Sequence, residues 1–136
     1  MSELGAMRLF EVTVRSGSEC YSRPVSARSA AAAKYRAYLD ADLDVPFGEY
    51  QRRCSVRLHR GELADDGYDY VRRYYGKDVR IGMRIKVVDE GPGATDREGE
   101  VAYPHTHRHY VHVALDGSMD TVMVHPGSVV PAQSVP

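Results

Sequence analysis

The C-terminal part of the sequence consists of short stretches in which apolar and polar residues alternate, separated by turn-forming pairs such as Asp116-Gly117 and Pro126-Gly127. Alternation with a period of two is typical of strands that bury one face. Because short strands expose their edges unless the sheet closes on itself, we predict a small closed barrel of five strands over residues 79–136. The five stretches are 81–88, 99–103, 109–115, 121–125 and Val129-Val130.

The beginning of the chain shows the same alternation. Residues 7–15 place Phe10, Val12 and Val14 on one face, which predicts a half-buried strand. The serine and glycine residues that follow favour a turn, and the chain is expected to return as a second strand over 20–25. We therefore predict a hairpin at the N-terminus.

The next segment combines a helical pattern with a third strand. Alanines and tyrosines recur at helical spacing over 27–40, and alanine is a strong helix former. Alternation resumes over 53–60, where Cys54, Val56 and Leu58 are expected to face inward. An antiparallel sheet with one helix across it, in the order β-β-α-β, buries the apolar side of both elements.

A second, short helix is predicted over 65–75. Its length makes it marginally stable in isolation, so it has to pack on another element. Tyr68, Val71, Tyr74 and Tyr75 form the stripe that we expect to make this contact and to join the two halves of the protein.

Three glycine-containing stretches and a terminal His-Pro pair form a pattern in the second half. They are Ile81-Gly82-Met83-Arg84-Ile85-Lys86-Val87-Val88, Arg97-Glu98-Gly99-Glu100-Val101, Val111-His112-Val113-Ala114-Leu115-Asp116-Gly117 and His125-Pro126. The pattern resembles a KOW-type SH3-like barrel over residues 79–131. The resemblance implies a binding module, because proteins with KOW-like barrels bind RNA, DNA or other proteins, often within larger assemblies.

The whole chain, including Asp69-Tyr70-Val71-Arg72-Arg73-Tyr74-Tyr75-Gly76, is similar to small proteins of unassigned function encoded by bacteriophages and prophages.

The expected fold class is α+β. Residues 1–78 are expected to form a small antiparallel sheet with one helix (β-β-α-β) plus a short linking helix. Residues 79–136 are expected to form a five-stranded SH3-like barrel.

The charge of the chain is balanced, because 18 Lys and Arg stand against 19 Asp and Glu for a net charge of −1. Binding to nucleic acid or to an anionic membrane would therefore require a local basic patch. No stretch approaches the roughly 20 apolar residues that span a bilayer, and the start lacks the features of a secretion signal. We expect a cytoplasmic protein without a membrane partner, in which Cys20 and Cys54 are reduced.

Motifs that carry catalysis are missing from the sequence. It contains no G-x-S-x-G elbow, no P-loop, no dinucleotide glycine fingerprint and no H-E-x-x-H zinc motif. The Gly91-Pro92-Gly93 segment lies between two predicted strands, without a following helix that would bind phosphate, and is interpreted as a turn. We predict a protein that is not an enzyme and uses no cofactor.

The histidines offer an alternative chemistry, since five of the six follow residue 104. In a strand, His105, His107 and His109 would share one face and resemble a metal-binding comb. The neighbouring proline favours a loop instead, and His112 and His125 are expected to point outward together. No Asp, Glu or Cys accompanies them in the pattern, so we predict surface histidines and no metal site, with metal binding as the alternative.

Local groups of basic residues are the strongest indication of a binding surface. In the predicted third strand Arg53, Arg57 and His59 share the outward face, where a basic strip with nearby tyrosines would hold phosphates and stack on bases. A solvated sheet face balanced by nearby carboxylates is the alternative. The candidate nucleic-acid-binding residues are Arg53, Arg57, Arg72, Arg73, Arg84, Lys86, Arg97, Tyr103 and Arg108.

The sequence thus predicts a non-enzymatic, phage-type accessory protein that binds nucleic acid or a nucleic-acid-bound complex. The alternative is a protein–protein adaptor or structural component that uses exposed tyrosines and barrel loops and that self-associates in one form. Salt dependence distinguishes the two, because phosphate binding weakens steeply as salt rises.

Overall fold

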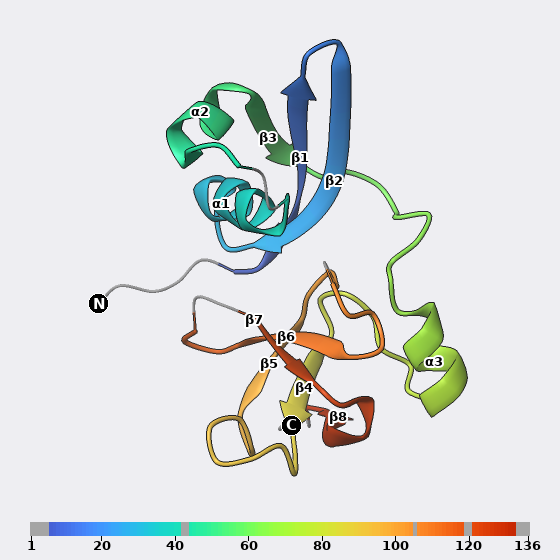
Figure 1. The fold of residues 1–136 in the computed structure, drawn as a ribbon. Coiled ribbons are helices and arrows are strands. Elements are labelled where there is room, and N and C mark those ends of the chain that lie inside the picture. The colour runs from blue at the N-terminus through green and yellow to red at the C-terminus, as the bar shows by residue number, and fades with distance from the viewer. Residues whose placement is uncertain (1–5, 42–43, 105, 119–120, 133–136) are drawn as a thin grey trace. The chain divides into compact units, whose positions relative to one another are not determined.

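The structure is a computed structural model of the chain and describes residues 6–41, 44–104, 106–118 and 121–132. It contains one antiparallel sheet of three strands and one of five, with few helices, which confirms the α+β class. The chain divides into two compact units, Leu4–Glu62 and Leu63–Pro136 (Figure 1). Among the described helices, none has both the length and the apolar character needed to cross a bilayer.

The first unit contains the three-stranded sheet, in the order β2-β1-β3. Strand β1 spans Arg8–Ser16 and pairs with β2, Glu19–Ala27, on one side and with β3, Cys54–Leu58, on the other. Gly17 turns the hairpin with a φ of 66°, in the left-handed region that glycine adopts without steric cost. The predicted hairpin and third strand are confirmed.

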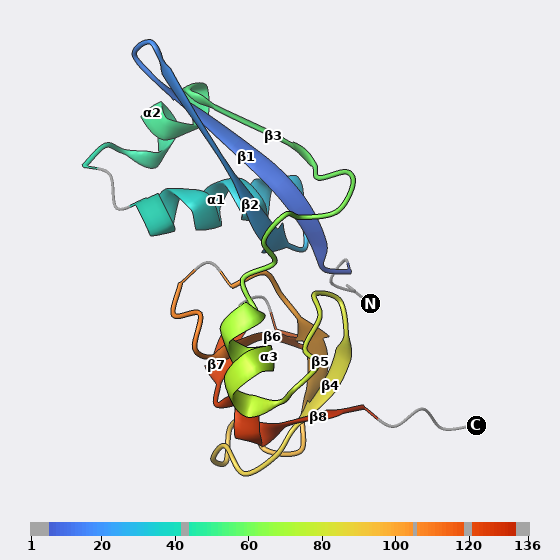
Figure 2. The same cartoon turned by 90° about the vertical axis from the view of Figure 1, so that its right-hand side faces the viewer.

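Two helices lie on the same side of this sheet (Figure 2), α1 over Ala30–Ala41 and α2 over Phe47–Arg52. Alanines of α1 pack directly on the sheet, and their small side chains let the helix backbone lie close to the strands. The buried core of the unit consists of Phe10, Val12, Val25, Ala27, Ala33 and Ala37.

Helix α2 is absent from the sequence-based prediction, which places one helix over 27–40 and then a strand over 53–60. Pro46 precedes the helix in an extended conformation, and Tyr50 then turns inward until it is 2% exposed. Its ring lies 5.2 Å from that of Tyr38 on α1, and burial raises the pKa of Tyr50 to about 12. A helix this short is unstable alone, so tertiary packing of Tyr50 explains why it forms and why the predicted β-β-α-β order was wrong.

The second unit contains the five-stranded sheet, in the order β7-β6-β5-β4-β8. Strands β4 to β7 follow one another as an antiparallel meander, and β8 returns to pair with β4. The elements of the sheet are β4 (Arg84–Val87), β5 (Glu98–Val101), β6 (Val111–Leu115), β7 (Thr121–Val124), the 3-10 turn η1 (Pro126–Ser128) and β8 (Val129–Pro131).

The prediction of a closed barrel was wrong. Within the described residues β7 and β8 are the two edges of the sheet and do not pair with each other. Strand β8 has three residues and ends at Pro131, which has no amide hydrogen to donate to a ladder. Helix α3, Asp69–Tyr75, completes the core instead, because Tyr68 and Val71 are fully buried among the strand residues.

Segment 63–78 therefore packs with the second sheet, whereas the sequence pattern groups it with the first. The predicted contact stripe of this helix is only half correct. Tyr68 and Val71 are buried, but Tyr74 is 73% exposed and Tyr75 is 40% exposed.

Gly99 of β5 faces the backbone of β6 at short range. A Cβ atom at this position would lie 2.3 Å from the carbonyl oxygen of Ala114 and 2.9 Å from the Cα of Leu115. Only glycine fits so near a neighbouring backbone, which explains a glycine within an otherwise regular alternation.

A partly buried ion pair fastens α3 to the segments on either side of it. Arg72 donates to both carboxylate oxygens of Asp66, at 2.8 and 2.9 Å, and to the carbonyl of Val79 at 2.9 Å. The backbone N–H of Tyr68 also donates to Asp66, at 2.9 Å. The guanidinium, followed by this backbone donor, holds the pKa of Asp66 below that of an ordinary aspartate.

Asp66→Asn should lower the melting temperature of the second unit by roughly 5–10 °C at pH 7. A carboxyl with a lowered folded-state pKa stabilises the fold above its unfolded-state value of about 3.9, and this stabilisation is lost as the pH falls through the lowered value. The difference in melting temperature between the wild type and Asp66→Asn should therefore shrink from pH 6 to pH 2. Circular dichroism melts across this range measure it, and a constant difference would contradict the assignment.

Candidate nucleic-acid interface

The side of the three-stranded sheet opposite α1 and α2 is polar. Thr13 in the central strand lies between Ser22 of β2 and Ser55 of β3, and the hydroxyl oxygens of Thr13 and Ser22 are 2.7 Å apart. Because side chains alternate along a strand, Glu11 and Arg15 share this side with Thr13. Both described helices of the unit lie on the other side, so this one is open within the unit (Figure 2). We call it the polar sheet face: Glu11, Thr13, Arg15, Ser22, Ser55, Arg57 and His59.

Two arginines on this face are available to a ligand. The side chain of Arg57 is 77% exposed, and its Nη2 lies 3.4 Å from Glu11 Oε1. An exposed ion pair of this kind contributes little in water, so a phosphate can compete for the guanidinium. Arg15 is exposed and, among the described residues, has no carboxylate within ion-pair distance.

The predicted strip of Arg53, Arg57 and His59 is formed only in part. His59 Nδ1 lies 3.9 Å from Glu11 Oε2, so His59 and Arg57 meet at the same carboxylate. Arg53 follows α2 directly, and its Nη2 donates to Glu49 of that helix at 2.6 Å. Leu58, which was expected to face inward, is 45% exposed at the end of β3, beyond the core under α1.

An open hollow of about 550 Å³ adjoins the face, lined by Glu11, Arg57, Leu58 and Arg60. Two of its four lining residues are arginines, and Glu11 is the single acid among them. The hollow is a place where an anionic group can approach Arg57 from the solvent.

The division of the chain into these units separates its charges. Leu4–Glu62 contains ten Lys and Arg against seven Asp and Glu, for a net charge of +3. Leu63–Pro136 contains eight against eleven, for a net charge of −3. A boundary at residue 78 reduces this difference, because segment 63–78 has four acids against three bases and residues 1–3 add Glu3, so the first part falls to +1. The balanced total charge therefore conceals one basic unit and one acidic unit.

The predicted contact residues on and near the second sheet are largely engaged by the protein itself. Arg84 donates to both carboxylate oxygens of Asp116, at 2.8 and 2.6 Å, and Arg97 donates to the backbone carbonyl of Asp116 at 3.0 Å. Lys86 Nζ lies 3.8 Å from Asp96 Oδ1. The structure brings Arg84 and Arg97 together at one turn, where they bind its acid and its backbone.

Arg108 and Tyr103 are also brought together. Arg108 donates to the Tyr103 hydroxyl at 3.0 Å and to Asp65 Oδ2 at 2.9 Å. The backbone N–H of Gly67, and then Arg108, hold the pKa of Asp65 below its ordinary value. Tyr103 is 9% exposed, so its ring supports Arg108 and offers little surface for stacking.

Of the two arginines predicted on α3, only one is open to solvent. Arg72 belongs to the ion pair with Asp66, and its side chain is 21% exposed. The side chain of Arg73 is 75% exposed, with Asp69 of the preceding turn 3.4 Å away. Arg73 is thus a predicted cation of the second unit that remains largely accessible.

The described histidines of the comb that the sequence allowed, His107 and His109, do not lie in a strand. His105 lies outside the described residues, His107 is exposed with a φ of 45°, and His109 packs edge-on against Tyr70. The described residues contain no group of three or more His, Cys, Asp or Glu placed to hold a metal ion. The expectation that His112 points outward was wrong, because His112 is fully buried in β6, while His125 is exposed.

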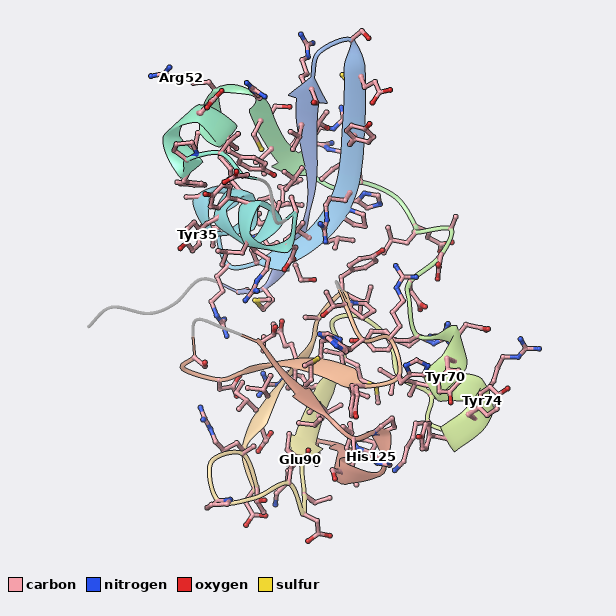
Figure 3. All side chains as sticks on the ribbon, viewed as in Figure 1. Tyr35, Arg52, Tyr70, Tyr74, Glu90 and His125 are labelled. Atoms are coloured by element: carbon pink, nitrogen blue, oxygen red, sulfur yellow. The ribbon has the colours of Figure 1, made fainter. Side chains whose placement is uncertain are left out.

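Exposed aromatic rings gather on α3 and the segments beside it, where the sequence pattern predicts packing residues. Tyr70 and Tyr74 lie on the outside of the helix, with His125 nearby (Figure 3). Their spacing of four residues places them on one side of a helix, which is the signal that could have identified them. We call the group the tyrosine patch: Tyr70, Tyr74, Tyr75, His109 and His125.

Comparison with known proteins does not place the chain in a family. No protein-family model, no curated protein and no solved structure matches it. The function has to be inferred from the residues of the chain itself.

Proposed function

We propose that the protein is a non-enzymatic accessory protein that binds nucleic acid through the polar sheet face of its first unit. The observation that carries this proposal is an open sheet face with Arg15 and Arg57 around a row of hydroxyl groups, in a unit with a net charge of +3. Phosphate oxygens accept hydrogen bonds from arginine, serine and threonine, so a nucleic-acid backbone suits this surface.

The proposed contacts are to phosphates and do not read base edges. Backbone contacts give affinity and register without sequence information. Arg57 and Arg15 are the main contacts in this proposal, and Arg53 is a flanking one that would have to leave Glu49. The protein should therefore bind strands of different sequence with similar affinity.

The remaining expectations belong to the same proposal. The meander β4 to β7, with β8 returning to β4, supports an SH3-like assignment for the second unit in an open form. The resemblance to phage and prophage proteins supports an accessory role in the cytoplasm, with nucleic acid or a nucleoprotein complex as the partner.

A salt titration tests the proposal directly. Fluorescence anisotropy of a labelled oligonucleotide should show binding at about 50 mM salt, with an affinity that falls linearly on logarithmic axes as salt rises. Two or three phosphate contacts predict a slope of about −2 to −3. Absence of binding at about 50 mM salt would overturn the proposal and leave the protein-adaptor alternative.

Glu11→Gln should raise the affinity for the same oligonucleotide by about threefold to tenfold at low salt. The substitution removes the one carboxylate on the polar sheet face and frees Arg57 from its ion pair. Glu49→Gln, which frees Arg53 beside α2, is the matched control and should have a smaller effect. An unchanged affinity in Glu11→Gln would place the phosphates elsewhere on the protein.

A further inference from the structure

The tyrosine patch contains an aromatic stack that is left open at one end. The rings of Tyr70 and Tyr74 lie 4.4 Å apart at an angle of 25°, which is a stacked arrangement. His109 packs edge-on against Tyr70, with its ring 4.5 Å away at 85°. Tyr70 therefore lies between two rings, and one face of Tyr74 packs on it.

Tyr74 is the outer member of the stack, with 73% of its surface exposed. A ring that served only to pack the core would be buried. Tyr68, the residue directly before the same helix, is such a ring. A ring with an open face is suited to a further planar group, because offset stacking of aromatic rings is favourable. The structure thus presents a platform for one more ring.

The same segment also carries exposed hydrogen-bond donors. Arg73 is the sequence neighbour of Tyr74, and its side chain is 75% exposed. His125 packs edge-on against Tyr75 at 5.2 Å, and its Nδ1 accepts a hydrogen bond from the N–H of Gly127 at 2.9 Å. A neutral imidazole that accepts at Nδ1 has its proton on Nε2, so this histidine retains a donor for a ligand oxygen.

We infer that the tyrosine patch stacks on unpaired bases, so that the nucleic-acid partner is single-stranded. This inference rests on the proposed function and specifies its substrate class. Bases in a duplex have both faces covered by their neighbours, whereas a single strand offers its ring faces to exposed aromatic side chains. Every ring of the patch carries a polar atom beside its apolar faces, which suits the flat faces and polar edges of a base.

The test compares Tyr70→Ala/Tyr74→Ala with Tyr70→Phe/Tyr74→Phe, and uses Tyr110→Ala as the control. Tyr110 is 41% exposed in the same unit and lies outside the patch. Each protein is titrated with a single strand of about 15 thymidines and with a duplex of equal length, which suits the site sizes of single-strand binders. The chain has ten tyrosines and no tryptophan, so quenching of its intrinsic emission by the strand reports stacking directly.

The double alanine variant should lose about fivefold to hundredfold in single-strand affinity and most of the quenching, while its duplex affinity stays unchanged. The double phenylalanine variant should keep the wild-type single-strand affinity, although its quenching falls because the emitting tyrosines at 70 and 74 are gone. Tyr110→Ala should keep both the affinity and the quenching. Wild-type single-strand affinity in the double alanine variant overturns the inference but leaves the proposed function standing. If the wild type binds neither the single strand nor the duplex, the inference and the proposed function are both overturned. If the wild type is a dimer and only the double alanine variant is a monomer, the inference is overturned and the patch is assigned to self-association.

Discussion

The variant Arg15→Glu/Arg57→Glu should lose most of the proposed affinity for nucleic acid, by about a hundredfold near 150 mM salt. Both side chains are exposed on the polar sheet face, and neither supports the core. The substitutions remove two guanidinium contacts and place carboxylates where phosphates would lie. The slope of log affinity against log salt should therefore become shallower by about 2.

Anisotropy titrations at several salt concentrations measure this loss, beside a control that carries the same kind of charge change. Arg80→Glu is suitable, because Arg80 is exposed in the second unit and pairs only with its neighbour Asp78 among the described residues. A neutral variant, Arg15→Gln/Arg57→Gln, should retain part of the affinity. The single variant Arg57→Glu changes the charge by the same amount as Arg80→Glu, and losses of equal size in these two would mean that overall charge, and not this face, governs binding.

Tyr68→Ala should unfold the second unit, since it lowers the free energy of unfolding by about 3–5 kcal/mol. The ring is completely buried among the strands, and it is the largest side chain in that core. Its hydroxyl donates to the carbonyl of Ala102 at 2.5 Å and accepts from the backbone N–H of His112 at 3.1 Å. These bonds tie the segment before α3 to β6 and to the residue after β5.

Hydrogen exchange of peptides that cover 98–115, together with thermal melts, measures the loss and localises it. Tyr68→Phe keeps the ring and removes only the hydroxyl, so it should lower the free energy of unfolding by about 1–3 kcal/mol. Tyr110→Ala removes an exposed ring from the same unit and should be close to neutral. Wild-type exchange in Tyr68→Ala would show that the strands form their core without α3.

Neighbouring tyrosines in one short segment thus have opposite roles. Tyr68 is buried and fastens α3 to the sheet, whereas Tyr70 and Tyr74 face the solvent and stack on each other. A loss of function in a Tyr74 variant and a loss of folding in a Tyr68 variant are separate outcomes. Measuring both in the same proteins distinguishes the binding role from the structural one.

The predicted basic residues divide in the same way. Sequence patterns identify Arg57 and Arg73, which the structure leaves exposed, and equally Arg72 and Arg84, which bind carboxylates bidentately. Separation along the chain does not distinguish them, because the partner of Arg72 is six residues away and the partner of Arg84 is 32 residues away. The sequence pattern does not single out Arg15, since it stands alone in sequence and becomes part of a basic face only when β1 lies between β2 and β3.

Strand positions and turns were determined by the sequence alone, because alternation of apolar residues and glycine-rich turns act over a few neighbouring residues. The spacing of Phe10, Val12 and Val14 is sufficient to indicate which side of β1 faces the core. Tertiary structure alone decided whether the second sheet closed, which unit received segment 63–78 and which arginines remained open to a ligand. These outcomes depend on contacts between residues far apart in the chain. Arg108 donates to Asp65, for example, only because the packing of whole elements brings the two residues together.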